Sequence, residues 1–99
     1  MTTTLKAPSG ADAAIKTAVP LAIIVAAAFA IGIEPTSWMC IVMAAAASSL
    51  ETVVTHFTLA PRREDYSKRK AMGSYYNHLA SISALSAALA VGIVYAVWP

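Results

Sequence analysis

Three long runs of apolar residues dominate the chain, at about residues 17–33, 38–59 and 77–98. Each run approaches the roughly 20 residues that an α-helix needs to cross about 30 Å of hydrocarbon. Polar residues gather in the stretches between the runs. This pattern predicts an all-α integral membrane protein with three transmembrane helices, in a single membrane domain over residues 1–99.

Capping and helix-breaking residues mark the ends of the first run. Ser9 and Asp12 have the spacing of a capping box, so a helix is expected to begin at about Gly10 and to continue into the run. Pro20 lies inside this helix and is expected to bend it, because proline lacks a backbone donor. A short turn at 34–37 then separates the first two runs.

The stretch 60–76 is expected to form a loop between the second and third helices. Pro61 stops the second run, and a mixed-charge sequence follows it. Gly73 offers a break before the third run. The tyrosine pair at 75–76 is of the kind that favours a membrane–water interface.

The composition favours a bilayer as the surroundings of the chain. Of the 99 residues, 59% are hydrophobic and 12% are charged, so a soluble chain of this length would lack the polar residues to cover itself. Three spans also leave no room for a separate soluble domain. Cys40 is the single cysteine, which excludes an intrachain disulfide and a metal site built on a cysteine pair.

The basic residues are distributed asymmetrically. Lys6 and Lys16 precede the first run, the other Lys and Arg residues lie within 62–70, and the 34–37 turn has none. Because Lys and Arg are retained on the side from which a protein is inserted, the N-terminus and the 60–76 loop are expected inside and the C-terminus outside. This suits a bacterial inner membrane, or the inner or thylakoid membrane of an organelle. The net charge of +2 favours anionic lipid headgroups over nucleic acid as partners.

Small residues recur at every fourth position in each run. The rows are Ala22, Ala26 and Ala30; Ala44, Ser48 and Thr52; and Ala80, Ala84, Ala88 and Gly92. Spacing of four places each row on one helix face, where small side chains allow close approach of another helix. We therefore expect the row from Ala80 to Gly92 to lie against a helix of this chain or of a partner, although an alanine-rich composition also produces such rows by chance.

Glu51 is an acidic residue in the middle of the second run. At 1.5 Å per residue it lies about 20 Å below Trp38, where an ionised carboxylate costs about 2.5–3.5 kcal/mol. It is therefore expected to be protonated, paired, or turned toward protein or water. Thr55 and Ser48 share its face. A structural carboxyl that bonds a neighbouring helix or a basic residue of a partner is the favoured interpretation, and a proton or cation relay is the alternative.

His56 and His78 are the two histidines, and the topology places them at similar depth near the inner ends of the second and third helices. They could bind a haem, another tetrapyrrole pigment or a metal through imidazole. The competing interpretation is that they are interfacial residues that contact water or lipid. No spacing in the sequence indicates a metal site, and no catalytic motif is present.

These observations favour a non-enzymatic accessory subunit of a larger integral membrane complex, in an energy-transducing membrane of the respiratory or photosynthetic kind. Other membrane-protein subunits and the lipid bilayer would be its partners. Two alternatives stay open: a tetrapyrrole- or metal-binding subunit that uses His56 or His78, and a homo-oligomeric proton or cation transporter or channel that uses Glu51.

The charge asymmetry makes the orientation testable. We expect Pro99 outside and Tyr66 inside, because every basic residue lies on two segments that share one side. A compartment-specific reporter fused after Pro99 measures this. Activity of that fusion only in the inner compartment would contradict the predicted orientation.

Overall fold

The computed structural model describes residues 10–99, and all of its regular structure is helical. Its elements are α1 (Gly10–Ile31), α2 (Trp38–Thr58), the 3-10 turn η1 (Ala60–Arg62), α3 (Arg63–Lys68) and α4 (Met72–Val97). Within these residues, the three long helices are long and apolar enough to cross a membrane, which indicates a membrane protein.

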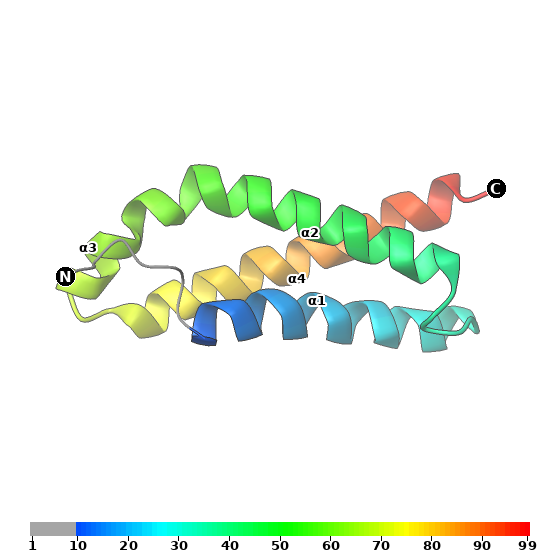
Figure 1. Cartoon of the computed structure of the whole chain (residues 1–99), viewed down its shortest axis with the longest axis horizontal. Coiled ribbons are helices and arrows are strands. Elements are labelled where there is room, and N and C mark those ends of the chain that lie inside the picture. Colours follow the sequence, from blue (N-terminus) through cyan, green and yellow to red (C-terminus); the bar gives the residue numbers. More distant parts are fainter. Residues whose placement is uncertain (1–9) are drawn as a thin grey trace.

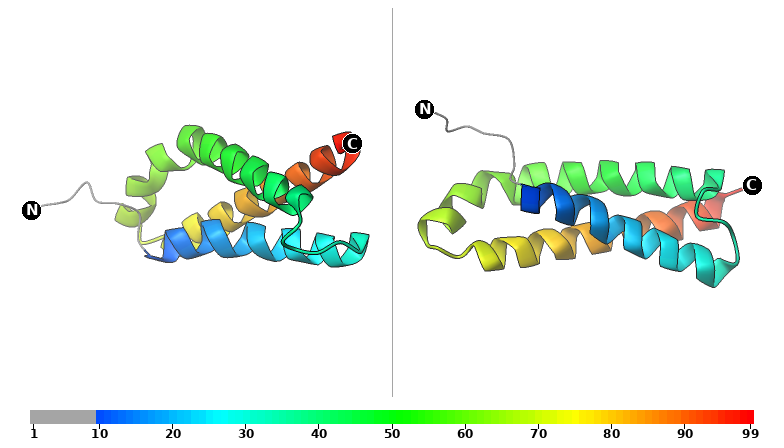
Figure 2. Two further views of the ribbon diagram at one scale, coloured as in Figure 1. Left: turned by 45° about the vertical axis from the view of Figure 1, so that its right-hand side comes forward. Right: turned by 60° about the horizontal axis from the view of Figure 1, so that its bottom comes forward.

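The long helices lie lengthwise in an elongated bundle of 49 × 22 × 20 Å. The start of α1, together with α3, lies at one end, and the α1–α2 turn and the C-terminus lie at the other (Figure 1). The views in Figure 2 show α4 running along both α1 and α2. All three long helices therefore pack on one another, with α4 as the shared neighbour.

Local hydrogen bonds explain where α1 ends and α2 begins. Gly32 adopts a φ of 89°, and its N–H and that of Ile33 both donate to the Ala28 carbonyl at 2.9 Å. This left-handed ending satisfies a carbonyl that the helix would leave free. Ser37 then caps α2, because its Oγ accepts from the Cys40 N–H at 3.4 Å.

One helix start agrees with the expectation and another does not. Gly10 is already helical, as expected, while Ser9 and Lys6 lie outside the described residues. The break expected at Gly73 is wrong, because Gly73 lies inside α4. The chain reverses instead at Lys70, whose φ is 56° and whose N–H donates to the Ser67 carbonyl at 3.1 Å. A lysine here takes the left-handed conformation that glycine usually supplies.

The helical parts of the chain extend beyond the predicted spans. Helix α1 starts before residue 17 and continues through Pro20, which is buried. Helix α4 starts before residue 77, so the tyrosine pair at 75–76 is helical. The predicted 60–76 loop contains η1 and α3 and is therefore a compact helical connection.

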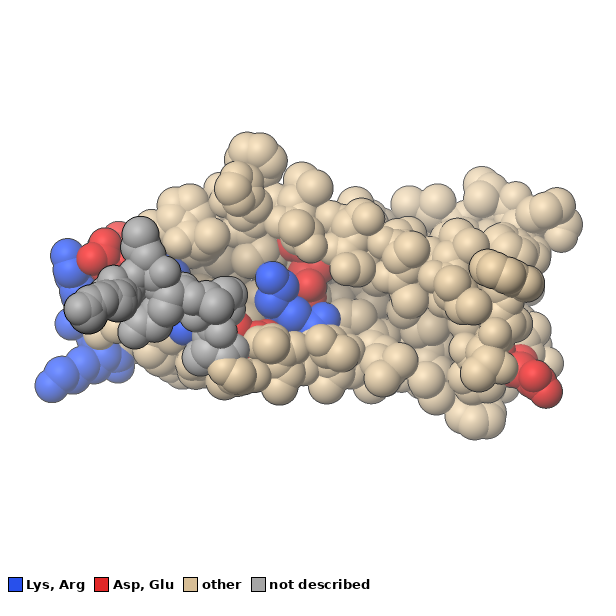
Figure 3. Space-filling model, in the orientation of Figure 1, with Lys and Arg blue, Asp and Glu red and all other residues tan. Residues whose placement is uncertain are grey.

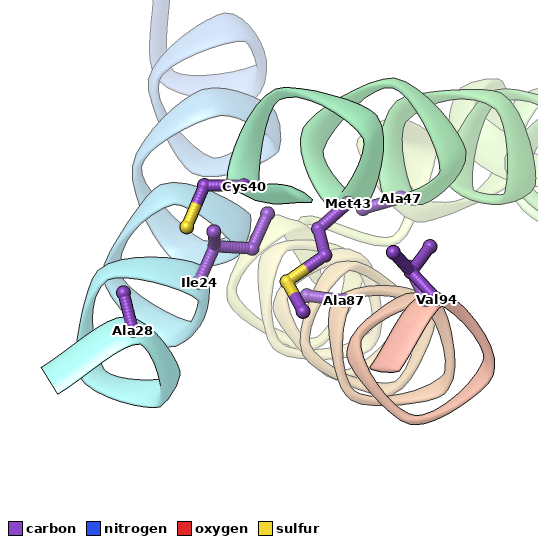
Figure 4. Packing of buried hydrophobic residues seen from close by; sticks show 8 residues of the cluster. Ile24, Ala28, Cys40, Met43, Ala47, Ala87 and Val94 are labelled. Atoms are coloured by element: carbon purple, nitrogen blue, oxygen red, sulfur yellow. The ribbon is translucent and has the colours of Figure 1, made fainter. Parts of the chain in front are cut away.

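The main apolar core lies at the end of the bundle that holds the α1–α2 turn. Its buried members come from all three long helices: Ile24, Ala28, Cys40, Met43, Ala47, Ala87, Ala90 and Val94. Figure 4 shows the Met43 side chain reaching from α2 toward Ala87 of α4. Most of these side chains are small, so helix backbones approach closely and the long Met43 side chain fills the space between them.

A second, smaller core lies at the basic end, where Leu59, Tyr75 and Leu79 are buried. Next to it, the carboxylate of Asp12 joins three elements. Arg63 donates to it from Nε and Nη2, both at 3.1 Å, and the Tyr75 hydroxyl donates at 2.9 Å. The Arg63 guanidinium carbon also lies 5.2 Å from the centre of the Tyr75 ring. We call these three residues the Asp12 clamp.

The Asp12 side chain is only 2% exposed, whereas Arg63 keeps 36% of its side chain exposed. The hydrogen bond to Asp12 is the main reason that the pKa of Arg63 is raised above its ordinary value. The guanidinium is therefore charged at any working pH. Its bidentate contact with the carboxylate fixes the position of the start of α3 relative to α1.

We expect Asp12→Asn to destabilise the fold by about 1.5–3 kcal/mol, because it removes a charged acceptor of three hydrogen bonds. Glu64→Gln is the matched control: its ion pair with Lys68 is long, at 4.0 Å, and highly exposed. Unfolding in detergent followed by circular dichroism measures both. Equal stability of the two variants would show that the clamp does not stabilise the bundle.

Candidate functional site

A groove runs between α1 and α2 on one face of the bundle. It consists of two adjoining hollows, of about 350 Å³ and about 210 Å³, which share Lys16, Thr17 and Ser48. In Figure 3, basic and acidic atoms meet in a hollow of this otherwise mostly uncharged face. We call it the α1–α2 groove.

Small side chains make up half of the residues that line the groove. Ala44, Ser48 and Thr52 of the predicted α2 row line it along one side, and Ala13 and Thr17 of α1 line it along the other. Short side chains on both walls leave room for the backbone of another helix to approach closely.

Glu51 lines the larger hollow, yet it is only 2% exposed. Its carboxylate accepts a hydrogen bond from the Ser83 hydroxyl of α4, and Ser83 is itself fully buried. Glu51 therefore lies at the floor of the groove, anchored from behind by α4. This is a contact of the structural kind expected for Glu51, and the relay role stays a prediction.

Thr55 lies one turn after Glu51 on the same inward face of α2, and it is 7% exposed. Among the described residues, its Oγ1 is the one buried side-chain polar atom without a hydrogen-bond partner. Burying a hydroxyl without a hydrogen bond lowers the stability of a fold by about 1–3 kcal/mol relative to burying one that is hydrogen-bonded. The inward face of α2 thus changes from apolar at Met43 and Ala47 to polar at Glu51 and Thr55.

Lys16 brings a cation to the groove. Its side chain is half-buried and lines both hollows. The groove therefore offers the Glu51 carboxylate as an acceptor beside the Lys16 ammonium.

The structure places the other small-residue rows away from the core. Ala22, Ala26 and Ala30 are exposed on α1. On α4, Ala80 and Ala84 are half-buried, whereas Ala88 and Gly92 are exposed, and a side chain added at Gly92 would meet no atom within 4 Å. The face of α4 that packs inside the chain is instead the one that carries Leu79, Ser83, Ala87, Ala90 and Val94. Contact of the predicted α4 row with a partner stays a prediction.

The two histidines are both exposed, one on α2 and one on α4. His56 is exposed on α2, where its ring contacts Phe57 edge-on, with centroids 5.0 Å apart. His78 is exposed on α4, with its ring centroid 6.1 Å from that of Tyr66. His78 lines a hollow between α2 and α4, and His56 does not. Over residues 10–99 no group of three or more His, Cys, Asp or Glu side chains comes together as a metal site would require.

Sequence reasoning missed the partners of the buried carboxylates. Asp12 was interpreted only as a helix cap, and its partners Arg63 and Tyr75 lie 51 and 63 residues away. Ser83 was not singled out, because α4 carries several serines and only the packing decides which one faces α2. The available signal was that an acidic residue close to an apolar run needs a donor.

Comparison of the chain with protein-family models, with curated proteins and with solved structures gave no match.

The Glu51 contact makes a stability prediction. Glu51→Gln should leave the fold nearly unchanged, because the amide oxygen still accepts from Ser83. Ser83→Ala should destabilise it by about 0.5–1.5 kcal/mol, because the carboxylate loses its bond. Ser81→Ala is the control, since the Ser81 hydroxyl is exposed and donates only to its own helix at Asn77.

Denaturant titration in detergent ranks the three variants. If Glu51→Gln instead folds and assembles normally but abolishes a proton- or cation-coupled activity, the structural role is wrong and the relay role is supported.

Proposed function

We propose that the chain is a small non-enzymatic accessory subunit of a larger integral membrane complex, and that a transmembrane helix of another subunit fills the α1–α2 groove. The observation that carries this proposal is Glu51, a nearly buried carboxylate at the floor of an open groove with walls of small side chains. The setting proposed is an energy-transducing membrane, with the basic 60–76 segment on the inner side.

Charge supports a helix as the occupant of the groove. In hydrocarbon, a carboxylate held by a single serine remains costly, whereas a donor from a neighbouring helix lowers that cost. A helix that bears an Arg, Lys, Ser or Thr at the depth of Glu51 could donate to the carboxylate. An aliphatic lipid chain offers no such donor.

Small residues exposed on α1 and α4 also support contact with other membrane helices. The exposed Ala22 row of α1 and the Ala88 and Gly92 positions of α4 present small residues outward. Helices that contact only lipid need no such surface, whereas helix–helix contacts in membranes are enriched in small residues. Within residues 10–99, the segments outside the long helices are the 32–37 turn, the connection that holds η1 and α3, and residues 98–99.

The alternatives for this chain have their own readouts. Binding of a tetrapyrrole at His56 or His78 would give the purified protein a visible absorption band. A homo-oligomeric channel would place a second copy in the α1–α2 groove, and light scattering of the detergent-purified chain measures that state. Both remain predictions from the sequence.

We expect Ser48→Leu to reduce the partner subunits recovered with the tagged chain from its native membrane by fivefold or more, because overpacking a contact costs about 1–3 kcal/mol. Ser49→Leu is the matched control: it is the same substitution one position away, at an exposed residue that lines neither hollow. Quantitative mass spectrometry after purification in mild detergent gives the subunit ratios.

Equal recovery with the two variants would overturn the proposal that the groove receives a partner. Loss of a homo-oligomer in Ser48→Leu, with no other subunit involved, would favour the second copy as the occupant.

A further inference from the structure

A second groove follows the junction of α2 and α4, apart from the α1–α2 groove. Its middle is a hollow of about 500 Å³. Toward the basic end it adjoins a hollow of about 320 Å³, with which it shares Arg62 and Tyr66. Toward the middle of the helices it adjoins one of about 290 Å³, with which it shares Ile82 and Leu85. The three hollows together form one continuous α2–α4 groove.

The basic end of this groove is cationic. Arg62 and Arg69 line it, against a single carboxylate from Asp65. Guanidinium groups match the oxygens of a phosphate in charge and in planar hydrogen-bond geometry. Tyr66 and His78 line the next part of the groove and add polar groups where the helices begin.

The other end of the groove is apolar. Leu50 and Val54 of α2 line it on one side, and Ile82, Leu85 and Leu89 of α4 line it on the other. Its surface is suited to an aliphatic chain, since these side chains offer no hydrogen-bond partner. Leu89 lies eleven residues after His78, a rise of about 16 Å along α4, which is about half of the roughly 30 Å hydrocarbon core and so the depth of one leaflet.

We propose that the α2–α4 groove binds one phospholipid with an anionic headgroup. Arg62 and Arg69 hold its phosphate, Tyr66 and His78 flank the glycerol region, and an acyl chain follows the groove past Leu85 to Leu89. From its basic end to its apolar end, the groove is first cationic, then polar and then apolar. A phospholipid has the matching order of anionic phosphate, polar glycerol and apolar acyl chain. This site is independent of the partner proposed for the α1–α2 groove, which lies on other residues.

The test uses the full-length, delipidated protein in detergent, with native mass spectrometry to count bound lipid. Phosphatidylglycerol and phosphatidylcholine with identical acyl chains are compared, and glycerophosphoglycerol supplies the same headgroup without chains. We expect retained phosphatidylglycerol at least fivefold above phosphatidylcholine. The soluble headgroup should not displace it at equal concentration, because binding needs the tail end of the groove as well.

Two double variants distinguish lipid binding at this site from attraction of lipid by the general surface charge. Arg62→Gln with Arg69→Gln should weaken phosphatidylglycerol binding by about fivefold for each arginine. Lys68→Gln with Lys70→Gln makes the same change in net charge on the same segment, at exposed residues that line none of the three hollows. This control should bind almost as the unmodified chain does.

Each contrary outcome is decisive. Equal losses in the two double variants would mean that the segment attracts anionic lipid only as a charged surface. Displacement by glycerophosphoglycerol would mean that a phosphate alone is recognised. If the unmodified protein retained as much phosphatidylcholine as phosphatidylglycerol, the site would not select an anionic headgroup, whatever the variants show.

Discussion

The Asp12 clamp is the contact on which the arrangement of the basic end depends. One buried carboxylate receives the Arg63 guanidinium and the Tyr75 hydroxyl, and so connects α1 with the beginnings of α3 and α4. In a lipid environment, burying apolar side chains supplies little drive for helices to associate, so specific polar contacts and close packing have to determine their positions. A charged acceptor with three donors is strong in such surroundings because water does not compete for it.

The interior is graded along the bundle. Small apolar side chains around Met43 fill the end near the α1–α2 turn, Glu51 and Ser83 form a polar contact further along, and the Asp12 clamp closes the basic end. The polar contacts all join helices that are distant in sequence, so they select one register of α4 against its neighbours. The two grooves lie on either side of α2, one with Glu51 and Lys16 and the other with Arg62 and Leu85. An accessory subunit that contacts a partner helix on one side and a lipid on the other would use both of these surfaces.

The small-residue rows did not identify the helix faces that pack against one another inside the chain. In an alanine-rich helix several faces carry small residues, and the sequence does not distinguish them. The α4 face that packs inside is the one from Leu79 to Val94, whereas Ala88 and Gly92 of the predicted row point outward. On this inward face Leu79 and Val94 fill space between helices, and Ser83 reaches Glu51. The α2 row, by contrast, lines the α1–α2 groove.

The sequence by itself determined the class of structure, because the length and polarity of each apolar run depend only on the composition of consecutive residues. Three long helices and the burial demanded by Glu51 follow from it in this way, since a carboxylate in an apolar run is costly wherever the helices lie. The tertiary structure alone decided which donor reaches Glu51, that Asp12 meets Arg63 and Tyr75, and that His78 lines a hollow between α2 and α4. Those contacts depend on how the helices are rotated and aligned against one another. Local spacing leaves that rotation open, and the packing of side chains from distant parts of the chain selects it.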